Sequence, residues 1–241
     1  MNLHLVTLKT TKYSDTQTIL TAFSREHGRV SFSLPAGTGK AAARMRALTM
    51  PLSVIECVSE RKGSAREILP MRQVVQDLPL ASLHTDPVKQ MMAMFLSEVL
   101  SVVLQCGEAD SSLFDFLVGS IRVLDAADAG RTANFHICFL LNLGRHLGIE
   151  PDVSTYVPGA IFDMSDGRWR TTAPLNRGYL QPDDAGTVFR LLRMTYSNMH
   201  RFGFNRMQRN AILDGILEFY SVHYVSLRHL RSLDILRAML N

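Results

Sequence analysis

The spacing of apolar residues changes near residue 80, and this change constrains the fold more than any other feature of the chain. Before it, apolar and polar residues alternate, as Val30, Phe32 and Leu34 illustrate. After it, apolar residues recur every three or four positions. A period of two is typical of strands, and a period near 3.6 is typical of helices. We therefore predict an α+β protein, with a β-rich domain over residues 1–80 and a helical domain over residues 81–241.

Strand patterns fill the first eighty residues. Five short segments combine alternation with β-branched side chains, namely residues 3–10, 16–24, 29–34, 52–58 and 68–71. The turn at His27-Gly28 joins the second and third as a hairpin, and a Gly-containing loop follows Pro35. Five short strands joined by basic loops indicate a small, strongly curved β-barrel.

Helix patterns and capping residues fill most of the remainder. Asp86 and Pro87 are typical of the first positions of a helix, and Gly148 is typical of the residue that follows one. The predicted helices cover residues 87–103, a segment from Ser111 or Ser112 to 124, and residues 132–147, 183–200, 205–224 and 227–240. Residues 149–181 break the pattern and are predicted to form an irregular insertion with a β-hairpin around Asp166-Gly167.

Charge is unevenly distributed along the 241 residues. Residues 1–80 hold eleven basic and six acidic side chains, a charge of +5, whereas residues 81–186 carry −6 and residues 187–241 carry +5. Arg outnumbers Lys 21 to 5, and its planar fork suits bidentate phosphate contacts, although genome composition explains an Arg-rich chain equally well. The two basic segments indicate a phosphate-bearing ligand more strongly than the net charge of +4 does.

The basic residues of the first segment fall at predicted loops and turns, where a barrel displays them. This pattern is typical of an electrostatic funnel for single-stranded nucleic acid, although a solvated basic surface is the plain alternative. Tyr13, Phe23 and Phe32 are candidate stacking platforms, but alternation favours core burial for the two Phe. The predicted nucleic-acid-binding residues are Lys9, Arg25, Arg29, Lys40, Arg44, Arg46, Arg61, Lys62 and Arg66.

No catalytic or metal-binding motif emerges. The string Gly37-Thr38-Gly39-Lys40 lacks both the first Gly and the hydroxyl residue of a phosphate-binding loop. There is neither an HExxH nor a GxSxG motif, and Asp163 and Asp166 occur where turn geometry alone favours Asp. We therefore expect no enzyme activity, no catalytic residue, no cofactor and no metal.

Cysteine usage and hydropathy suggest where the protein works. Cys57, Cys106 and Cys138 are widely spaced and read as buried small side chains in a reducing compartment. The N-terminus lacks a signal-peptide pattern, and no uncharged apolar run has the length of a membrane span. The stripe from Met91 to Phe95 favours core packing over a peptide-binding groove. A cytoplasmic location without membrane contact is expected.

Several short strings resemble the RecO family of bacterial DNA-repair proteins. YSD at residues 13–15 and ILTAFSREHG at 19–28 resemble the opening of the family's N-terminal barrel. FLLNLG at 139–144 and GIEPD at 148–152 resemble its mid-chain helix end. DMSDGR at 163–168, YSVHY at 220–224 and HLRSLDIL at 229–236 resemble a variant found in some branches.

The resemblance implies an OB-fold that binds single- and double-stranded DNA, an annealing activity and a mediator role in recombination. In that role, RecO acts with RecR to load RecA onto DNA coated by single-stranded-DNA-binding protein, whose acidic tail it engages through the helical domain. A nucleoid-associated location follows. Many members carry a four-cysteine zinc site after the segment matching residues 148–151, but residues 149–181 contain no Cys. We therefore expect no zinc, with the hairpin held by packing alone.

Two hypotheses about function remain. The first is a non-catalytic DNA-binding and annealing mediator, whose DNA contacts come from residues 1–80. The second is an adaptor that binds acidic peptides and has only incidental affinity for DNA. For an acidic peptide, charge alone suggests the C-terminal cations Arg201, Arg206 and Arg209.

Overall fold

The computed structural model describes residues 1–59, 68–105, 108–174, 178–224, 227 and 229–240. These residues form two compact units, Met1–Ala127 with Leu230–Leu240, and Asp128–His229. None of the described helices has the length and apolar content needed to cross a bilayer.

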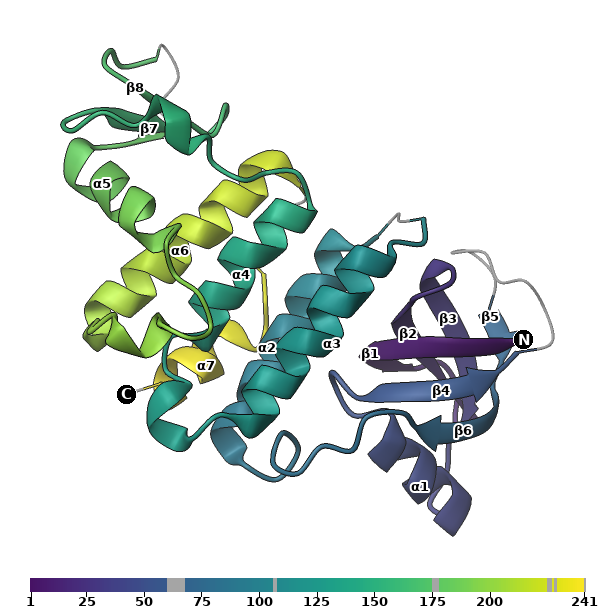
Figure 1. Ribbon diagram of the computed structural model, residues 1–241. Helices are drawn as coiled ribbons and strands as arrows, with labels where there is room; N and C mark the ends of the chain where they lie inside the picture. Colours follow the sequence, from purple (N-terminus) through teal and green to yellow (C-terminus); the bar gives the residue numbers. More distant parts are fainter. Residues whose placement is uncertain (60–67, 106–107, 175–177, 225–226, 228, 241) are drawn as a thin grey trace. The chain divides into compact units, whose positions relative to one another are not determined.

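A six-stranded sheet curls into a half-barrel in the first unit (Figure 1). Its strand order is β5-β3-β2-β1-β4-β6, with β3 and β5 parallel and the other pairs antiparallel. The bounds are β1 Asn2–Lys12, β2 Gln17–Ser24, β3 Gly28–Pro35, β4 Val54–Val58, β5 Ile68–Pro70 and β6 Arg72–Gln76. The predicted α+β class, with an OB-type β-domain followed by helices, is confirmed.

Alternation sets the register of the half-barrel. Val30, Phe32 and Leu34 are buried, while the residues between them are partly exposed. A one-residue slip would turn this apolar face outward, so the pattern specifies a single pairing. Phe23 and Phe32 are 1% and 0% exposed, which confirms the core assignment of both.

Two elements of this unit were not predicted. Helix α1 (Lys40–Leu48) lies between β3 and β4, and β6 follows β5 almost directly. Helix α1 is rich in Ala and Arg, which favour helices, but only Ala42 is buried, so apolar periodicity is weak. In β6 only Val74 is buried, and one buried residue makes no recognisable alternation.

Helices α2 (Pro87–Val103) and α3 (Ser111–Ala126) complete the first unit together with α7 (Leu233–Met239). The Asp86 carboxylate accepts hydrogen bonds from the backbone N–H groups of Val88 and Lys89, as its predicted capping role requires. Helix α7 begins at Leu233 rather than 227.

Glu98 of α2 fixes the start of α7. Its carboxylate accepts hydrogen bonds from the backbone N–H groups of Arg231 (2.9 Å) and Ser232 (3.0 Å) and from the Ser232 hydroxyl. Burial opposes ionisation of Glu98, but these bonds and the charge of Lys9 outweigh it and lower its pKa. The carboxylate is therefore ionised at neutral pH and holds the C-terminal segment against α2.

Glu98→Gln is expected to weaken this attachment by about 1 kcal/mol, because the bonds lose their charge assistance. Hydrogen exchange at the amides of Arg231 and Ser232 should accelerate about fivefold. The exposed Glu108→Gln provides the control, and equal exchange in both variants would show that Glu98 does not hold the segment.

The second unit packs three helices against a small sheet. The helices are α4 (Phe135–His146), α5 (Pro182–Leu191) and α6 (Arg206–His223), and the sheet has the order β8-β7-β9. Its strands are β7 Ile161–Asp163, β8 Arg168–Arg170 and β9 Tyr179–Leu180. Three short 3-10 turns complete the chain's described helices, at Ala129–Arg131, Val153–Thr155 and Met199–Arg201.

The predicted ends of these helices are right at Gly148 and wrong near residue 200. Gly148 has a φ of 72°, and the N–H of Ile149 bonds to the carbonyl of Gly144, which ends α4 as a Schellman motif. Helix α5 instead ends at Leu191. There the Asn198 side chain accepts from the Thr195 N–H and donates to the Arg193 carbonyl, so it replaces the helical bonds.

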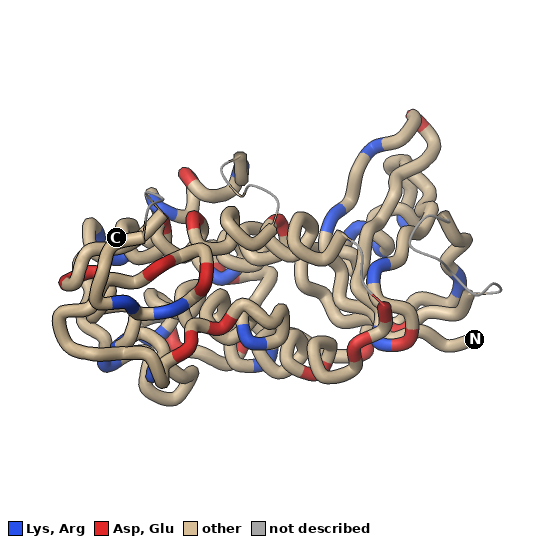
Figure 2. Tube along the Cα trace, turned by 90° about the horizontal axis from the view of Figure 1, so that it is seen from above, with Lys and Arg blue, Asp and Glu red and all other residues tan. Residues whose placement is uncertain are grey.

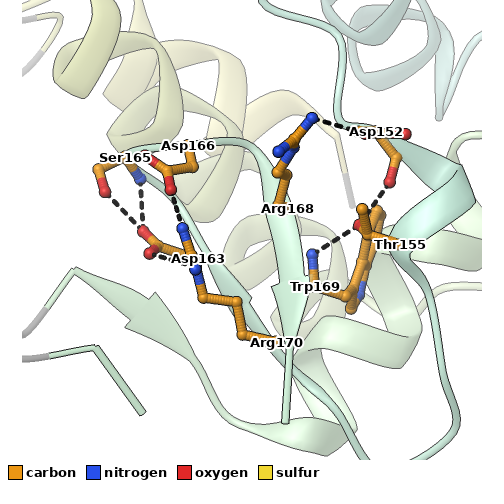
Figure 3. Close-up of polar contacts among 8 residues, drawn as sticks. All are labelled: Asp152, Thr155, Asp163, Ser165, Asp166, Arg168, Trp169 and Arg170. Carbon is orange, nitrogen blue, oxygen red and sulfur yellow. Dashed lines mark hydrogen bonds and ion pairs between the residues drawn. The ribbon is translucent and has the colours of Figure 1, made fainter. Parts of the chain in front are cut away.

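Polar contacts as well as packing hold the predicted hairpin of the insertion (Figure 3). Arg170 pairs with the buried carboxylate of Asp163 and with Asp166. Arg168 pairs with Asp152, and the Trp169 indole N–H donates to the Ala185 carbonyl. The expectation that packing alone holds the hairpin is therefore wrong, because side-chain ion pairs add to it.

Candidate nucleic-acid interface

Helix α1 presents three of the predicted cations to solvent. Ala42 is buried, and Met45 and Leu48 pack against the half-barrel core. This anchoring turns the opposite face of the helix outward, where all three cations are exposed: Lys40, Arg44 and Arg46. Arg46 also donates to the carbonyl of Gly37, which fixes its guanidinium beside the loop that precedes the helix.

The β1–β2 hairpin contributes an exposed aromatic ring next to a cation. The N–H groups of Tyr13 and Ser14 both donate to the Gln17 carbonyl, and the Ser14 hydroxyl accepts from the Gln17 N–H. This turn leaves Tyr13 69% exposed. The neighbouring Lys12 pairs with Asp15 at 2.7 Å, but both side chains are largely exposed, so the pair contributes little and Lys12 can exchange partners.

Residues of the β1–β2 hairpin and of α1 line a common hollow of about 400 Å³. Lys12 and Arg46 both line it, although they are 34 positions apart in the sequence. Its other lining residues come from β1, β2, the end of β3 with the loop after it, and α1 with the residue that caps it, and they are Thr10, Thr18, Leu34, Pro35, Ala36, Gly37, Ala42, Met45 and Thr49. The fold thus places two cations around a partly apolar hollow at the end of the half-barrel that carries α1.

Two of the predicted DNA-binding cations also form contacts within the first unit. Arg25 forms a bidentate ion pair with Asp115 of α3, at 2.6 and 3.1 Å, and lies over the ring of Phe114. Arg29 donates to the carbonyls of Ser101 and Leu104 at the C-terminal end of α2. Both therefore join the sheet to the helices of their unit.

Of the four remaining predicted cations in residues 1–80, only Lys9 belongs to the described residues. Lys9 is exposed on β1, near enough to Glu98 to influence its pKa. Arg61, Lys62 and Arg66 lie outside the described residues. The sequence prediction missed three residues that line the hollow: Thr10, Lys12 and Thr18. Lys12 could have been found, because it stands directly before Tyr13 at a predicted turn.

The cations predicted to bind an acidic peptide divide in the same way. Arg201 and Arg206 are exposed. Arg209 is 8% exposed and donates to the Asn134 side-chain oxygen and the Phe204 carbonyl. These bonds hold Arg209 within the second unit, and its low exposure leaves little of the side chain for a ligand. Burial also lowers the pKa of its guanidinium.

The second unit also contains an apolar pocket of about 220 Å³, framed by α4, α5, α6 and β7. Its charged lining residues are Glu150 and Asp184. Glu150 is paired with Arg145 at 2.7 Å, which leaves Asp184 as the uncompensated charge among the described lining residues. The charge of the pocket therefore does not favour an acidic peptide.

Reactive groups give no alternative site in the described part of the chain. Burial raises the pKa of the Cys57 and Cys138 thiols to about 12, so neither is a thiolate at neutral pH. Cys106 lies outside the described residues. No group of three or more His, Cys, Asp or Glu able to hold a metal ion occurs among the residues described. Figure 2 shows Lys and Arg positions interspersed with Asp and Glu positions along both units.

Two family models together match most of the chain. Residues 4–71 match the family described as recombination protein O N terminal, and residues 84–234 match recombination protein O C terminal. The chain belongs to the RecO family. The resemblance noted in the sequence is thereby confirmed, and the half-barrel with the candidate interface corresponds to the RecO N-terminal domain.

Curated relatives are similar to this chain over nearly its whole length. A protein of Phocaeicola vulgatus named DNA repair protein RecO is 33% identical, over 97% of this chain and 96% of the relative. Proteins of the same name from Bacteroides fragilis and Porphyromonas gingivalis are each 34% identical, with the same coverage. These relatives are named for DNA repair, and they cover nearly the same span as the two family matches together.

Proposed function

We propose that this protein binds single- and double-stranded DNA through residues 1–80 and anneals complementary strands. One observation supports the proposal: Lys12 and Arg46 line one hollow in a chain of a DNA-repair family, and the residue after Lys12 is an exposed Tyr. Cations that follow a backbone and an aromatic ring for stacking are the two components of single-strand binding.

We further propose that the protein is a mediator without catalytic activity. It would act with RecR to help load RecA onto DNA coated by single-stranded-DNA-binding protein, and the helical domain over residues 81–241 would contact that protein's acidic tail. Family membership supports this role. Of the three cations suggested for the tail, the exposed Arg201 and Arg206 remain candidates, and Arg209 is left out because it is buried.

Replacing the three α1 cations together by Gln is expected to flatten the salt dependence of single-strand binding. Each phosphate contact contributes about −0.7 to the slope of log K against log salt, so loss of all three changes the slope by about two units. The measurement is a titration of labelled oligo(dT) at several salt concentrations with Lys40→Gln, Arg44→Gln and Arg46→Gln combined.

A matched variant separates local contact from net charge. Arg122→Gln, Arg201→Gln and Arg206→Gln combined remove the same charge from exposed helical positions. Their slope should stay near that of the unmodified protein. If the two triple variants change the slope equally, α1 does not contact the backbone. Annealing of complementary strands tests the wider proposal, because an adaptor would bind acidic peptides and leave the annealing rate unchanged.

A further inference from the structure

The hollow between α1 and the hairpin is lined by three kinds of side chain. Leu34 and Ala42 are buried apolar residues, and Met45 is half-buried. Thr10 of β1 and Thr18 of the neighbouring strand β2 add hydroxyl groups to the lining. The two cations, Lys12 and Arg46, are exposed side chains of the same lining.

A nucleobase has the matching chemistry. Its faces are flat and stack on apolar surface, its edge carries hydrogen-bond donors and acceptors, and its nucleotide brings a phosphate on either side. Thr hydroxyls both donate and accept, so they can bond to the edge of any base. A purely anionic ligand would leave the apolar lining residues without a partner, and an apolar peptide side chain would leave the cations and hydroxyls without one.

We propose that this hollow takes up one unpaired nucleobase of a DNA strand, while Lys12 and Arg46 hold the flanking phosphates. The inference rests on the proposed DNA binding and adds to it a subsite that distinguishes a single strand from a duplex. A base within a duplex is stacked on both faces and paired along its edge, so it can reach a pocket only after it is unstacked and unpaired. The volume of about 400 Å³ lies within the range of small-molecule sites.

Two adjacent threonines of β1 allow a matched test. Thr10 pairs with Leu20 and lines the hollow, whereas Thr11 pairs with Ile19 and does not. Both are exposed, and successive strand residues point to opposite faces. Thr10→Leu therefore narrows the hollow and removes a hydroxyl, while Thr11→Leu makes the same chemical change on the other face.

The full-length protein is titrated with labelled oligo(dT), with a duplex of equal length, and with an abasic oligonucleotide that keeps the phosphates. Thr10→Leu is expected to weaken oligo(dT) binding at least fivefold and to change duplex and abasic binding less than twofold. Thr11→Leu is expected to change all three less than twofold. Thermal melting checks that both variants fold.

The possible failures are distinct. Equal oligo(dT) affinities for Thr10→Leu and Thr11→Leu would overturn the subsite while leaving DNA binding intact. An equal loss on the abasic strand would also overturn it, because the hollow would then contact the backbone alone. If the unmodified protein bound none of the three probes, the proposed function itself would fail. Should Thr10→Leu melt early, Thr18→Val replaces it, and an oligo(dT) loss of about threefold with unchanged abasic binding is expected.

Discussion

Replacing Asp163 by Ala is expected to lower the free energy of unfolding of the second unit by about 3 kcal/mol. The Asp163 side chain is only 4% exposed. One of its oxygens accepts from the N–H (3.0 Å) and hydroxyl (2.6 Å) of Ser165, and the other accepts from Arg170 at 3.1 Å. Each hydrogen bond to a charged group contributes about 1.5–3 kcal/mol, and Arg170 keeps some hydration after the change.

Trp169 allows this loss to be measured where it occurs. It is the single Trp of the chain, it is 4% exposed, and it lies on the same strand as Arg170. Its fluorescence emission therefore reports on the insertion during denaturant unfolding.

The pKa of Asp163 is lowered, because its bonds with Ser165 and the charge of Arg170 outweigh the effect of burial, which raises it.

A lowered pKa fixes the sign of the pH dependence. The stability that Asp163 adds is complete above the ordinary Asp pKa of about 4 and is lost as the pH falls through the lower folded value. The unmodified protein should therefore approach Asp163→Ala in stability at acid pH. Asp166→Ala is the control, because its carboxylate pairs with the same Arg170 but is 46% exposed, and it should cost less than 1 kcal/mol. Equal costs for both variants would show that burial of Asp163 is unimportant.

The insertion shows how far the sequence alone determines the fold. The Asp166-Gly167 turn was predictable, because Gly167 has a φ of 66° and only Gly adopts this freely. The role of Asp163 was not, since turn geometry explained its presence and its partner Arg170 follows seven positions later. Local propensity identifies turns and caps, whereas pairing between side chains depends on the register that the folded hairpin creates.

The candidate interface divides along the same line. The α1 cations were chosen from charge and position, and all three are exposed. Their contact with nucleic acid stays a prediction. Arg25 and Arg29 look identical to them in sequence, yet their partners on α3 and α2 are more than 70 positions away. Which cations are engaged internally is therefore a tertiary property that charge counting cannot detect.

Tyr13→Ala is expected to weaken single-strand binding by about 1–3 kcal/mol, or roughly 5- to 150-fold, because one base loses its aromatic stacking partner. The ring is 69% exposed, so its removal leaves the core intact and the melting temperature nearly unchanged. The measurement is the affinity for labelled oligo(dT) at fixed salt, because a change in salt would alter the electrostatic part of binding.

Tyr13→Phe distinguishes stacking from the chemistry of the hydroxyl. Phe keeps the ring and removes only the oxygen, so this variant should bind within about twofold of the unmodified protein. The slope against salt should also stay constant in both variants, since neither change removes a cation. If Tyr13→Ala retains full affinity, or if Tyr13→Phe loses as much as Tyr13→Ala, the hairpin tip does not stack on DNA, and binding would have to depend on the cations around the hollow alone.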